Sequence, residues 1–430
     1  MKYTRVKGCY DIHSKADEIW KDPAFWNIVE SAARSVAFSN SLNEIRTPVF
    51  EYTDVFLRMG ETSDVVSKEM YTFEDKGGRS VSLRPEITAP VIRAFIENSL
   101  HQKGLHRFYY IGPCWRYDRA QKGRYRQFNQ FGIEIIGVDD PSADIECISA
   151  LLEFYQNVGL KDLKLLINTI GDKTVRKQFA AALKEHFTPL KTSLSQDSQH
   201  RLHDNPLRIL DSKDPNDRLL IQHAPKLSEF LTETQKNSFT NIQETLTALQ
   251  IDYTVDPTLV RGLDYYCDTV FEIVAENDTA AQNTLGAGGR YNGLIKEMGG
   301  PDLSGVGFAT GLERVIQTLL RQSMDQETLK CEAPPEYYLI GLSETSRKAL
   351  LPTLVFLRKL GKKTLLHQAN FNIKKALTQA EKIQSRYAII LGEEELAKNR
   401  VKIKNLSTRQ EMEHPITYLK TLGNYQDPNV

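Results

Sequence analysis

The chain of 430 residues is long enough for two or three domains with separate hydrophobic cores. With 40% hydrophobic and 26% charged residues it has the composition of a globular protein, and no apolar run is long enough to cross a bilayer. Its five cysteines are odd in number, widely spaced and never in a C-x-x-C pair, which argues against a disulfide framework and a structural zinc site.

The charge is distributed unevenly along the chain. Lys and Arg equal Asp and Glu at 55 each, yet residues 336–430 contain 16 Lys and Arg against 9 Asp and Glu, a surplus of seven. This basic segment is compatible with a polyanionic partner, and equally with a solvated surface that has no partner. The first 20 residues lack the apolar run of a signal peptide, so we expect a cytoplasmic protein without membrane contact.

The first hundred residues predict two helices with strands between them. Apolar residues at three- and four-residue spacing predict a helix over residues 15–42. Residues 43–56 form a strand pattern that Pro48 interrupts, which favours a sheet edge at a boundary or an interface. A hairpin around residues 76–78 then leads into a helix from about Ala89 to Asn98.

Two polar residues, Glu86 and Thr88, fall at the turn before this second helix. Capping of the helix would by itself explain Thr88. The carboxylate of Glu86 could equally hold the ammonium group of a ligand, because it lies where free backbone N–H groups and polar side chains meet.

Residues 107–137 predict two antiparallel strands joined by a long basic loop. Along the second strand, Phe131 and its alternate neighbours share a face typical of a core. The opposite face carries Gln130 and Glu134, roughly 13 Å apart, with Gly132 between them. The gap at Gly132 could admit a small, elongated polar ligand. An ordinary sheet with one wet face and a bulge at Gly132 is the alternative.

The next segments alternate helix and strand before a change of character. An amphipathic helix over residues 141–160 precedes a strand at 164–172, and residues 173–250 predict an inserted helical subdomain. Arg261, Asp264, Tyr265 and Tyr266 then gather at the head of a strand from Thr269 to Val274, and a glycine-rich stretch follows. The chain contains neither a P-loop nor a G-x-G-x-x-G fingerprint, so a nucleotide must be held in another way.

The last part of the chain predicts a strand, a helix, a linker and a compact α/β domain. After a tight turn at Gly311, Arg314 lies in the first helical turn, off the apolar stripe, where it suits a phosphate or a surface salt bridge. The Pro-Pro pair at residues 331–335 marks the linker. Strands and helices alternate beyond it, which indicates a partly parallel sheet.

These stretches resemble the signatures of one enzyme class. Motifs 1, 2 and 3 of the class II aminoacyl-tRNA synthetases are similar to EIRTPVFE, WRYDRAQKGRYRQFNQFGIEIIG and GVGFATGLERVI. Signatures particular to the histidyl-tRNA synthetase family resemble LRPEITAP, LVRGLDYY and GAGGRYNGL. The similarity runs from about Arg5 through nearly the whole chain.

The resemblance implies an α/β fold class. It comprises an α+β catalytic domain at residues 1–330 with an antiparallel six- or seven-stranded sheet flanked by helices, and an α/β anticodon-binding domain with a mixed sheet at 336–430. It also implies a homodimer formed through motif 1. The implied reaction activates L-histidine with ATP, helped by Mg²⁺, to histidyl-adenylate and pyrophosphate, and then transfers histidine to the 3′ end of tRNA(His). Such chemistry needs cations, because negative charge develops on phosphorus.

The resemblance also assigns residues to the site. Arg116 and Arg261 would be catalytic, contacting the α-phosphate and the substrate carboxylate, and Glu134 with Tyr265 or Tyr266 would bracket the imidazole nitrogens. Which tyrosine does so, and which groups bind the metal, stays open. The implied histidine-binding residues are Glu86, Ile87, Thr88, Arg116, Gln130, Glu134, Arg261, Tyr265 and Tyr266; the ATP-binding residues are Arg116, Asp118 and Arg314.

The implied tRNA contacts lie in three regions. The motif 2 loop would meet the acceptor end, the insertion the acceptor stem, and the C-terminal domain the anticodon. The acceptor-end residues would be Gln121, Lys122, Arg124 and Arg126. Four residues depart from the family pattern: Asp118 for glutamate, Ala120 for proline, Ile87 for glycine or methionine, and Asn292 for aspartate. The shorter Asp118 would hold adenine or the loop less tightly.

One alternative is a catalytically silent paralogue that acts as a regulatory or tRNA-binding subunit. It predicts loss of the arginines and of the C-terminal domain. Because Arg116, Arg261, Arg314 and that domain are all present, the sequence favours the active enzyme.

Overall fold

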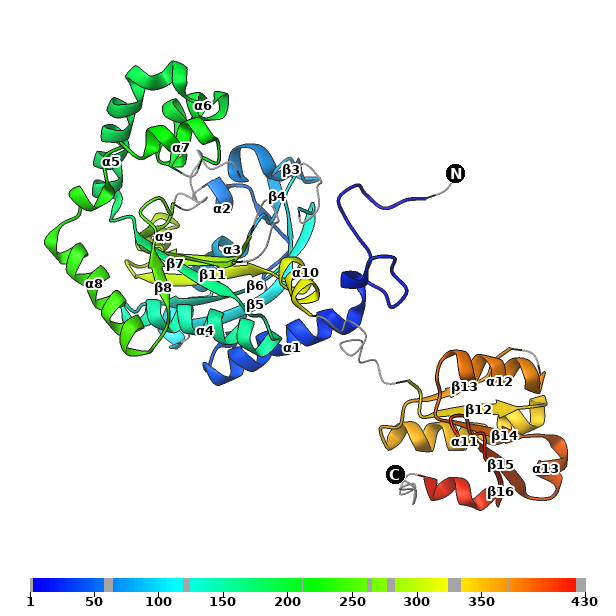
Figure 1. The fold of residues 1–430 in the computed structure, drawn as a ribbon. Helices are drawn as coiled ribbons and strands as arrows, with labels where there is room; N and C mark the ends of the chain where they lie inside the picture. Colours follow the sequence, from blue (N-terminus) through cyan, green and yellow to red (C-terminus); the bar gives the residue numbers. More distant parts are fainter. Residues whose placement is uncertain are drawn as a thin grey trace. The chain divides into compact units, whose positions relative to one another are not determined.

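A computed structural model gives the fold of the chain (Figure 1). Two compact units divide it, Met1–Lys330 and Cys331–Val430, and each is described by itself. The structure describes residues 3–57, 65–104, 106–118, 124–210, 212–260, 265–276, 283–323, 334–369 and 371–422.

The first unit is built on a sheet that contains eight strands among the described residues. Its six inner strands pair antiparallel, and the two edge strands, β1 and β8, add in parallel. The inner part confirms the antiparallel expectation, while the whole sheet is mixed. In spatial order the strands are β1 (Asn43–Glu44), β5 (Arg107–Trp115), β6 (Gln127–Ile136), β11 (Gly305–Gly311), β10 (Thr284–Arg290), β9 (Cys267–Ala275), β7 (Leu163–Thr169) and β8 (Tyr253–Val255).

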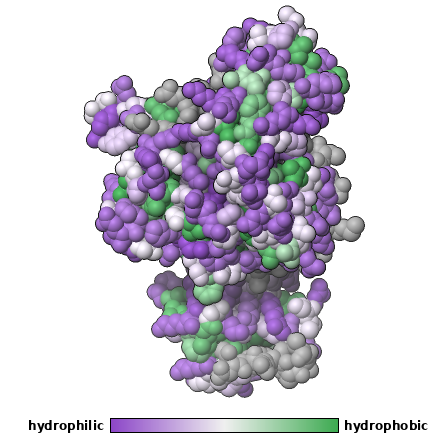
Figure 2. Space-filling model, turned by 90° about the vertical axis from the view of Figure 1, so that its left-hand side faces the viewer, coloured by the Kyte–Doolittle hydropathy of each residue, from purple (hydrophilic) through white to green (hydrophobic). Residues whose placement is uncertain are grey.

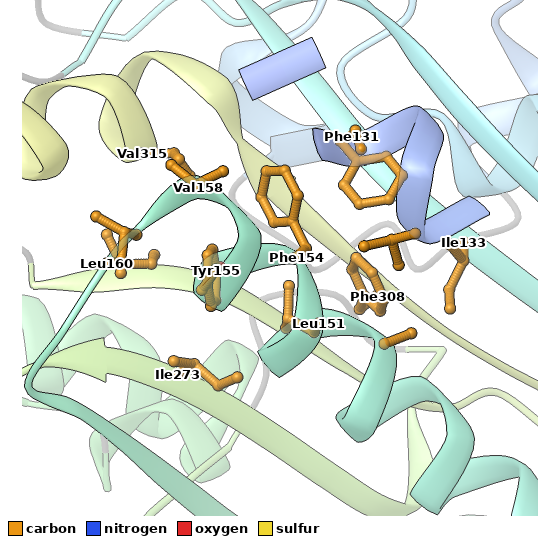
Figure 3. Packing of buried hydrophobic residues seen from close by; sticks show 14 of the residues in the cluster. Phe131, Ile133, Leu151, Phe154, Tyr155, Val158, Leu160, Ile273, Phe308 and Val315 are labelled. Carbon is orange, nitrogen blue, oxygen red and sulfur yellow. The ribbon is translucent and has the colours of Figure 1, made fainter. Parts of the chain in front are cut away.

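One face of this sheet packs against four helices, α1 (Pro23–Ser39), α4 (Ser142–Val158), α8 (Glu233–Ala248) and α10 (Leu312–Gln322). Phe131 and Ile133 of β6 point into this core, together with Phe154 of α4 and Phe308 of β11 (Figure 3). The alternation predicted for β6 is therefore confirmed, since its apolar face is the face that the helices cover.

The opposite face packs against α2 (Asp54–Leu57), α3 (Thr88–Glu97) and α9 (Leu294–Glu297). Ile136 of β6 and Tyr110 of β5 contribute to this second core. The polar residues of β6 belong to the same face, so the candidate site lies between the sheet and α3.

The N-terminal region differs from its prediction in two places. α1 begins at Pro23 rather than near residue 15, because the Asp22 side chain accepts the Ala24 N–H and caps the helix with proline in its first turn. The strand predicted for residues 43–56 is split by Pro48, and it ends in the short helix α2. Its second half, β2 (Phe50–Tyr52), joins β4 (Ser80–Leu83) and β3 (Tyr71–Glu74) in a separate small sheet, which confirms the hairpin.

The inserted segment has a core of its own. This core is formed by buried side chains from residues 175–231. They come from α5 (Lys173–Phe187), α6 (Gln196–Asp204) and the loops around α7 (Pro215–Ile221). The last predicted helix of the insertion, α8, instead places Ile242 and Leu246 in the main core beside α4. The separately packed part of the insertion is therefore shorter than residues 173–250.

The second unit is an α/β domain with a mixed five-stranded sheet among the described residues. β13, β12 and β14 run parallel, whereas β15 and β16 add antiparallel, which confirms the partly parallel sheet. β16 and α13 were not predicted. The elements are β12 (Tyr337–Gly341), α11 (Glu344–Lys359), β13 (Thr364–Leu366), α12 (Ile373–Lys382), β14 (Tyr387–Leu391), α13 (Glu393–Ala397), β15 (Arg400–Asn405) and β16 (Glu411–Pro415).

The surface shown in Figure 2 is mainly hydrophilic, with small hydrophobic areas scattered over it. Among the helices of the described part of the chain, none has the length and apolar character needed to span a membrane.

Candidate active site

A buried carboxyl group lies at the centre of the site. Glu134 of β6 is 1% exposed and accepts hydrogen bonds from the hydroxyls of Tyr291 (2.7 Å) and Tyr110 (3.3 Å). It has room because its partner on β11 is Gly307, where a Cβ would overlap the Glu134 carboxylate. Burial raises the pKa of Glu134 to about 8, against the effect of these hydroxyls. The site therefore holds a carboxyl group that changes charge close to neutral pH.

The space over Gly132 is filled by protein, so the prediction that a ligand lies there is wrong. Tyr110 pairs with Gly132 across β5 and β6, and a Cβ at position 132 would overlap the Tyr110 hydroxyl and the Phe308 carbonyl oxygen. The alternative, a sheet with a solvent-exposed face and a bulge at Gly132, is wrong as well. β6 pairs without interruption with β5 and β11, and its polar face is buried. The large side chain on one strand fills the space that the missing side chain of the glycine on the next strand leaves.

Glu86 has the capping role that the sequence assigned to Thr88. Its two oxygens accept the backbone N–H groups of Thr88 (2.7 Å) and Ala89 (2.8 Å) at the start of α3. Burial raises the pKa of both Glu86 and Glu134, and side-chain hydrogen bonds with Thr88 oppose that rise in each. Thr88 therefore lies between the two carboxyl groups, and the structure brings together three of the predicted histidine-binding residues.

Tyr265 lies within electrostatic reach of the carboxyl pair. Its ring centre lies 4.6 Å from that of Tyr266 and 6.0 Å from that of Tyr291. Burial raises the pKa of Tyr265 well above its ordinary value, and the charges of Tyr266, Glu86 and Glu134 add to the effect. Tyr266 is equally buried, and its backbone oxygen accepts a hydrogen bond from Arg176 at 2.6 Å.

Gln130 and Ile87 complete the described part of the predicted pocket. Gln130 is buried, and its Oε1 accepts a hydrogen bond from the Cys114 thiol at 3.3 Å. It stands opposite Gly311, directly before α10. Ile87 is a core residue between the sheet and α3, so this departure from the family pattern supplies apolar packing.

Two of the three predicted arginines lie within the described residues. Arg116 donates from Nε to the Pro85 carbonyl oxygen at 2.9 Å, and its guanidinium lies 5.1 Å from the ring centre of Phe128. Burial raises the pKa of Glu86, and the nearby Arg116 charge lowers it, so Arg116 lies within electrostatic reach of that carboxylate. Arg314, in the first turn of α10, donates to the Thr284 carbonyl oxygen. Arg261 lies outside the described residues, as does Asp264.

The base of the motif 2 loop is held by ionic and aromatic contacts. Asp118 pairs with Arg124 at 3.0 Å, and the Arg126 guanidinium lies 4.1 Å from the ring centre of Tyr117. Gln121 and Lys122 lie outside the described residues, as does Ala120. Asn292, another departure, accepts the Gly305 N–H through its side-chain oxygen at 3.2 Å, which is a structural role.

Sequence reasoning missed two residues of the site, Tyr110 and Tyr291. Each lies over a glycine of a neighbouring strand, Tyr110 over Gly132 and Tyr291 over Gly305. A strand glycine signals that a bulky neighbour is close. The pairing register that identifies the neighbour is not visible in the sequence.

The fold and the site together define a class of protein. Motif 2 runs from the end of β5 through β6, motif 3 forms β11 and the start of α10, and β11 pairs directly with β6. Motif 1 enters the same sheet through β1 and continues into β2. A central sheet with antiparallel inner strands, in which motif 2 pairs with motif 3 and motif 1 adds at the edge beside β5, is that of a class II aminoacyl-tRNA synthetase.

Comparisons with known proteins identify the family. A family model described as histidyl-tRNA synthetase matches residues 27–315, and one described as an anticodon-binding domain matches 356–421. The chain is 45% identical over 411 residues to a histidine–tRNA ligase of Protochlamydia amoebophila, covering 95% of this chain and 96% of that one. It is 41% identical over 429 residues to one of Pediococcus pentosaceus, covering 98% and 99%. Apo histidyl-tRNA synthetase of S. aureus is similar in structure, with a TM-score of 0.79, 34% identity and 99% and 100% coverage.

The chain therefore belongs to the histidyl-tRNA synthetase family. Its activity is the ATP-dependent joining of histidine to tRNA, and the relatives favour this enzyme over a catalytically silent paralogue. The family assignment does not depend on a ligand over Gly132.

Proposed function

We propose that histidine binds between the sheet and α3, with its imidazole against Glu134 and Tyr265. One observation carries this proposal: the Glu134 carboxyl is buried and its partners among the described residues are hydroxyls rather than cations. A buried carboxylate without a cation needs further N–H donors. An imidazole N–H supplies one, and the ligand would lie beyond the Tyr110 hydroxyl rather than over Gly132.

The amino end of histidine would lie against Glu86, Thr88 and Gln130. The Glu86 carboxylate, already fixed by two backbone N–H groups, keeps lone pairs for an ammonium group. This arrangement discriminates against apolar analogues, because they would leave buried polar groups unpaired.

Arginines would stabilise the charge that develops during activation. A carboxylate oxygen of histidine attacks the α-phosphorus of ATP, and pyrophosphate leaves. Arg116 and Arg261 would contact the α-phosphate and the substrate carboxylate, and Arg314 would hold the outer phosphates, with Asp118 near the adenine. Arginine suits these positions, since its planar guanidinium is always charged and binds phosphate through two N–H groups.

Mg²⁺ would enter with the phosphates of ATP. Within the described ranges no group of three or more His, Cys, Asp or Glu side chains could hold a metal ion. Mg²⁺ is commonly bound through one or two carboxylates plus substrate phosphates, so the protein need not provide a cage.

The tRNA would contact both units. The second unit has a surplus of seven positive charges in residues 336–430 and matches an anticodon-binding domain, so we assign the anticodon to it. Residues 121, 122, 124 and 126 of the motif 2 loop would meet the acceptor end, and the insertion would reach the acceptor stem. We place the enzyme in the cytoplasm, without membrane contact.

The small sheet supports a homodimer. Phe50, Tyr52 and Phe73 lie on one of its faces and are 53%, 52% and 49% exposed. An exposed aromatic face of this kind marks an interaction surface. Because motif 1 supplies β2, the occupant we propose is the same surface of a second copy.

The test of this function is histidine-dependent exchange of pyrophosphate into ATP. Purified protein should exchange with histidine and not with other amino acids, and absence of exchange would refute the proposed adenylation. Arg261→Ala should lower exchange by a factor of 100 or more, about what removal of a donor to a developing charge costs. It should leave tRNA binding intact, and equal loss of tRNA binding would assign Arg261 a structural role instead.

A further inference from the structure

Residues 5–11, here called the N-terminal strap, contact motif 2 and motif 3, and Tyr10 of the strap packs on the sheet face that α1 and α10 cover. The strap is anchored locally by Arg5 Nε, which donates to the Cys9 carbonyl oxygen at 3.1 Å. Tyr10 inserts its ring among aromatic side chains, with centres 4.7 Å from Trp20 and 5.2 Å from Tyr125. This segment carries none of the residues that the family resemblance assigns to the site.

The first contact of the strap is with motif 3. The Tyr10 hydroxyl donates to Oε1 of Glu313, the residue before Arg314 in the first turn of α10. The same Glu313 oxygen accepts the backbone N–H (2.7 Å) and the side-chain amide (3.0 Å) of Asn129 on β6. The Asn129 amide also donates to the Tyr10 hydroxyl at 3.2 Å. Tyr10, Glu313 and Asn129 therefore form a hydrogen-bond network in which each residue bonds to the other two, and which links α10 to β6.

The second contact of the strap is with motif 2. The Gly8 carbonyl oxygen accepts the Arg126 N–H at 2.8 Å, and the Arg126 carbonyl oxygen accepts the Arg116 N–H at 2.9 Å. Gly8 has a φ of +87°, and a Cβ there would lie 2.7 Å from Cγ of Arg126. Only glycine fits such a close approach in this conformation. One short segment thus contacts both arginine-bearing motifs, motif 2 through its backbone and motif 3 through the Glu313 side chain.

We propose that Tyr10 is a positioning residue for amino acid activation. It holds Glu313 against Asn129, and thereby fixes the start of α10, with Arg314, relative to β6 and to Arg116, which directly follows β5. This inference rests on the proposed role of Arg314 at the ATP phosphates. A tyrosine hydroxyl suits the position, because it can accept from Asn129 and donate to the carboxylate at once.

The test uses Tyr10→Phe in the full-length enzyme, which removes the hydroxyl and keeps the ring. We expect KM for ATP in pyrophosphate exchange to rise about tenfold, the order of one hydrogen bond to a charged group. KM for histidine should change less than twofold, since Glu86 and Glu134 do not contact the strap in the described structure. Tyr3→Phe, the same change at an exposed position of the N-terminal segment, should leave both constants unchanged.

Two readouts separate positioning from a merely structural role. Burial raises the pKa of Glu313 to about 7, although the hydrogen bond from the Tyr10 hydroxyl opposes this rise. Removing the hydroxyl in Tyr10→Phe should therefore raise the Glu313 pKa further and move the pH profile of kcat/KM for ATP to higher pH. In a double-mutant cycle, Tyr10→Phe should have little further effect once Glu313 is replaced by Gln.

Equal losses for ATP and histidine, an unshifted pH profile or additive effects in the cycle would overturn the inference. Normal exchange by both wild type and Tyr10→Phe would overturn it too, while leaving the proposed function intact. Absence of exchange in the wild type would instead refute the proposed function itself.

Discussion

On the sheet face that packs against α3, large side chains lie beside glycines of the neighbouring strands. Tyr110 lies over Gly132, and Glu134 lies over Gly307. The glycines thus let a carboxyl group and a phenol enter a region that a regular pleated sheet would fill with aliphatic side chains. The resulting carboxyl group is buried and has its pKa raised to about 8.

The first prediction concerns the protonation of Glu134. Burial sets its pKa at about 8 in the free site, and an imidazole N–H bonded to the carboxylate favours the ionised form, so histidine binding should release a proton. KM for histidine should therefore fall as the pH rises from about 7 towards about 8, above the ordinary imidazole pKa of about 6.5. Pyrophosphate exchange measured across this range would show the slope.

Glu134→Gln is the matched control, because its amide does not titrate. Its KM should be higher than that of the wild type and nearly independent of pH over the same range. A variant that kept the full slope would show that the proton is released elsewhere.

At the scale of elements, the pairing of β5, β6 and β11 decides what fits the site. Gly132→Ala should destabilise the protein by about 1–3 kcal/mol, because the new methyl group has to displace Tyr110 or the β11 backbone. Urea unfolding measures the change. Gly311→Ala, where φ is −85° and no atom lies within 4 Å of the added Cβ, should unfold nearly as the wild type does. Equal stability of the two variants would show that Tyr110 does not hold its place tightly.

The insertion depends on one carboxylate. Asp217 Oδ2 accepts the hydroxyls of Ser195 (2.6 Å), Ser198 (2.6 Å) and Ser212 (2.5 Å), and Oδ1 accepts the Ser195 N–H at 2.8 Å. Burial raises the pKa of Asp217, and these donors outweigh that effect and lower it overall. The stabilisation is thus complete above the unfolded pKa of about 3.9 and is lost as the pH falls through the lower folded value.

Asp217→Ala should therefore loosen the insertion while the main sheet stays folded. Loss of a buried acceptor shared by several donors costs about 2–4 kcal/mol. Hydrogen exchange should rise in α5, α6 and α7, and pyrophosphate exchange should persist. Asp197→Ala, at an exposed position of α6, should change stability by less than about 0.5 kcal/mol. Global unfolding of Asp217→Ala would show that the insertion and the sheet form one cooperative unit.

At the scale of the whole molecule, the proposed dimer predicts a change of mass. Phe50→Asp places a charge on the exposed aromatic face of the small sheet, and burying it in an interface would be strongly unfavourable. Sedimentation should give about twice the chain mass of 49.0 kDa for the wild type and the single-chain mass for the variant. Leu219→Asp, at an exposed position of the insertion, should remain dimeric. A dimeric Phe50→Asp would place the interface elsewhere.

Several features could be predicted from local sequence patterns. The β5–β6 hairpin, the apolar face of β6 and the partly parallel C-terminal sheet all follow from side-chain periodicity, which short-range geometry imposes. The resemblance named Glu86, Thr88 and Glu134 as histidine-binding residues, and the structure places Thr88 within hydrogen-bonding reach of both carboxyl groups; their role in binding stays a prediction. The start of α1 was predicted too early, because the capping signal of Asp22 and Pro23 was outweighed by periodicity.

The sequence by itself determined the family and most of the order of the elements, because motifs and periodicities are local properties of the chain. Only the tertiary structure decided that Tyr110 fills the gap over Gly132, that Glu86 caps α3, and that the strap joins Glu313 to Asn129. These contacts depend on strand register and on packing between residues distant in the chain, and a side chain's neighbours across strands are set by the fold rather than by its own sequence context.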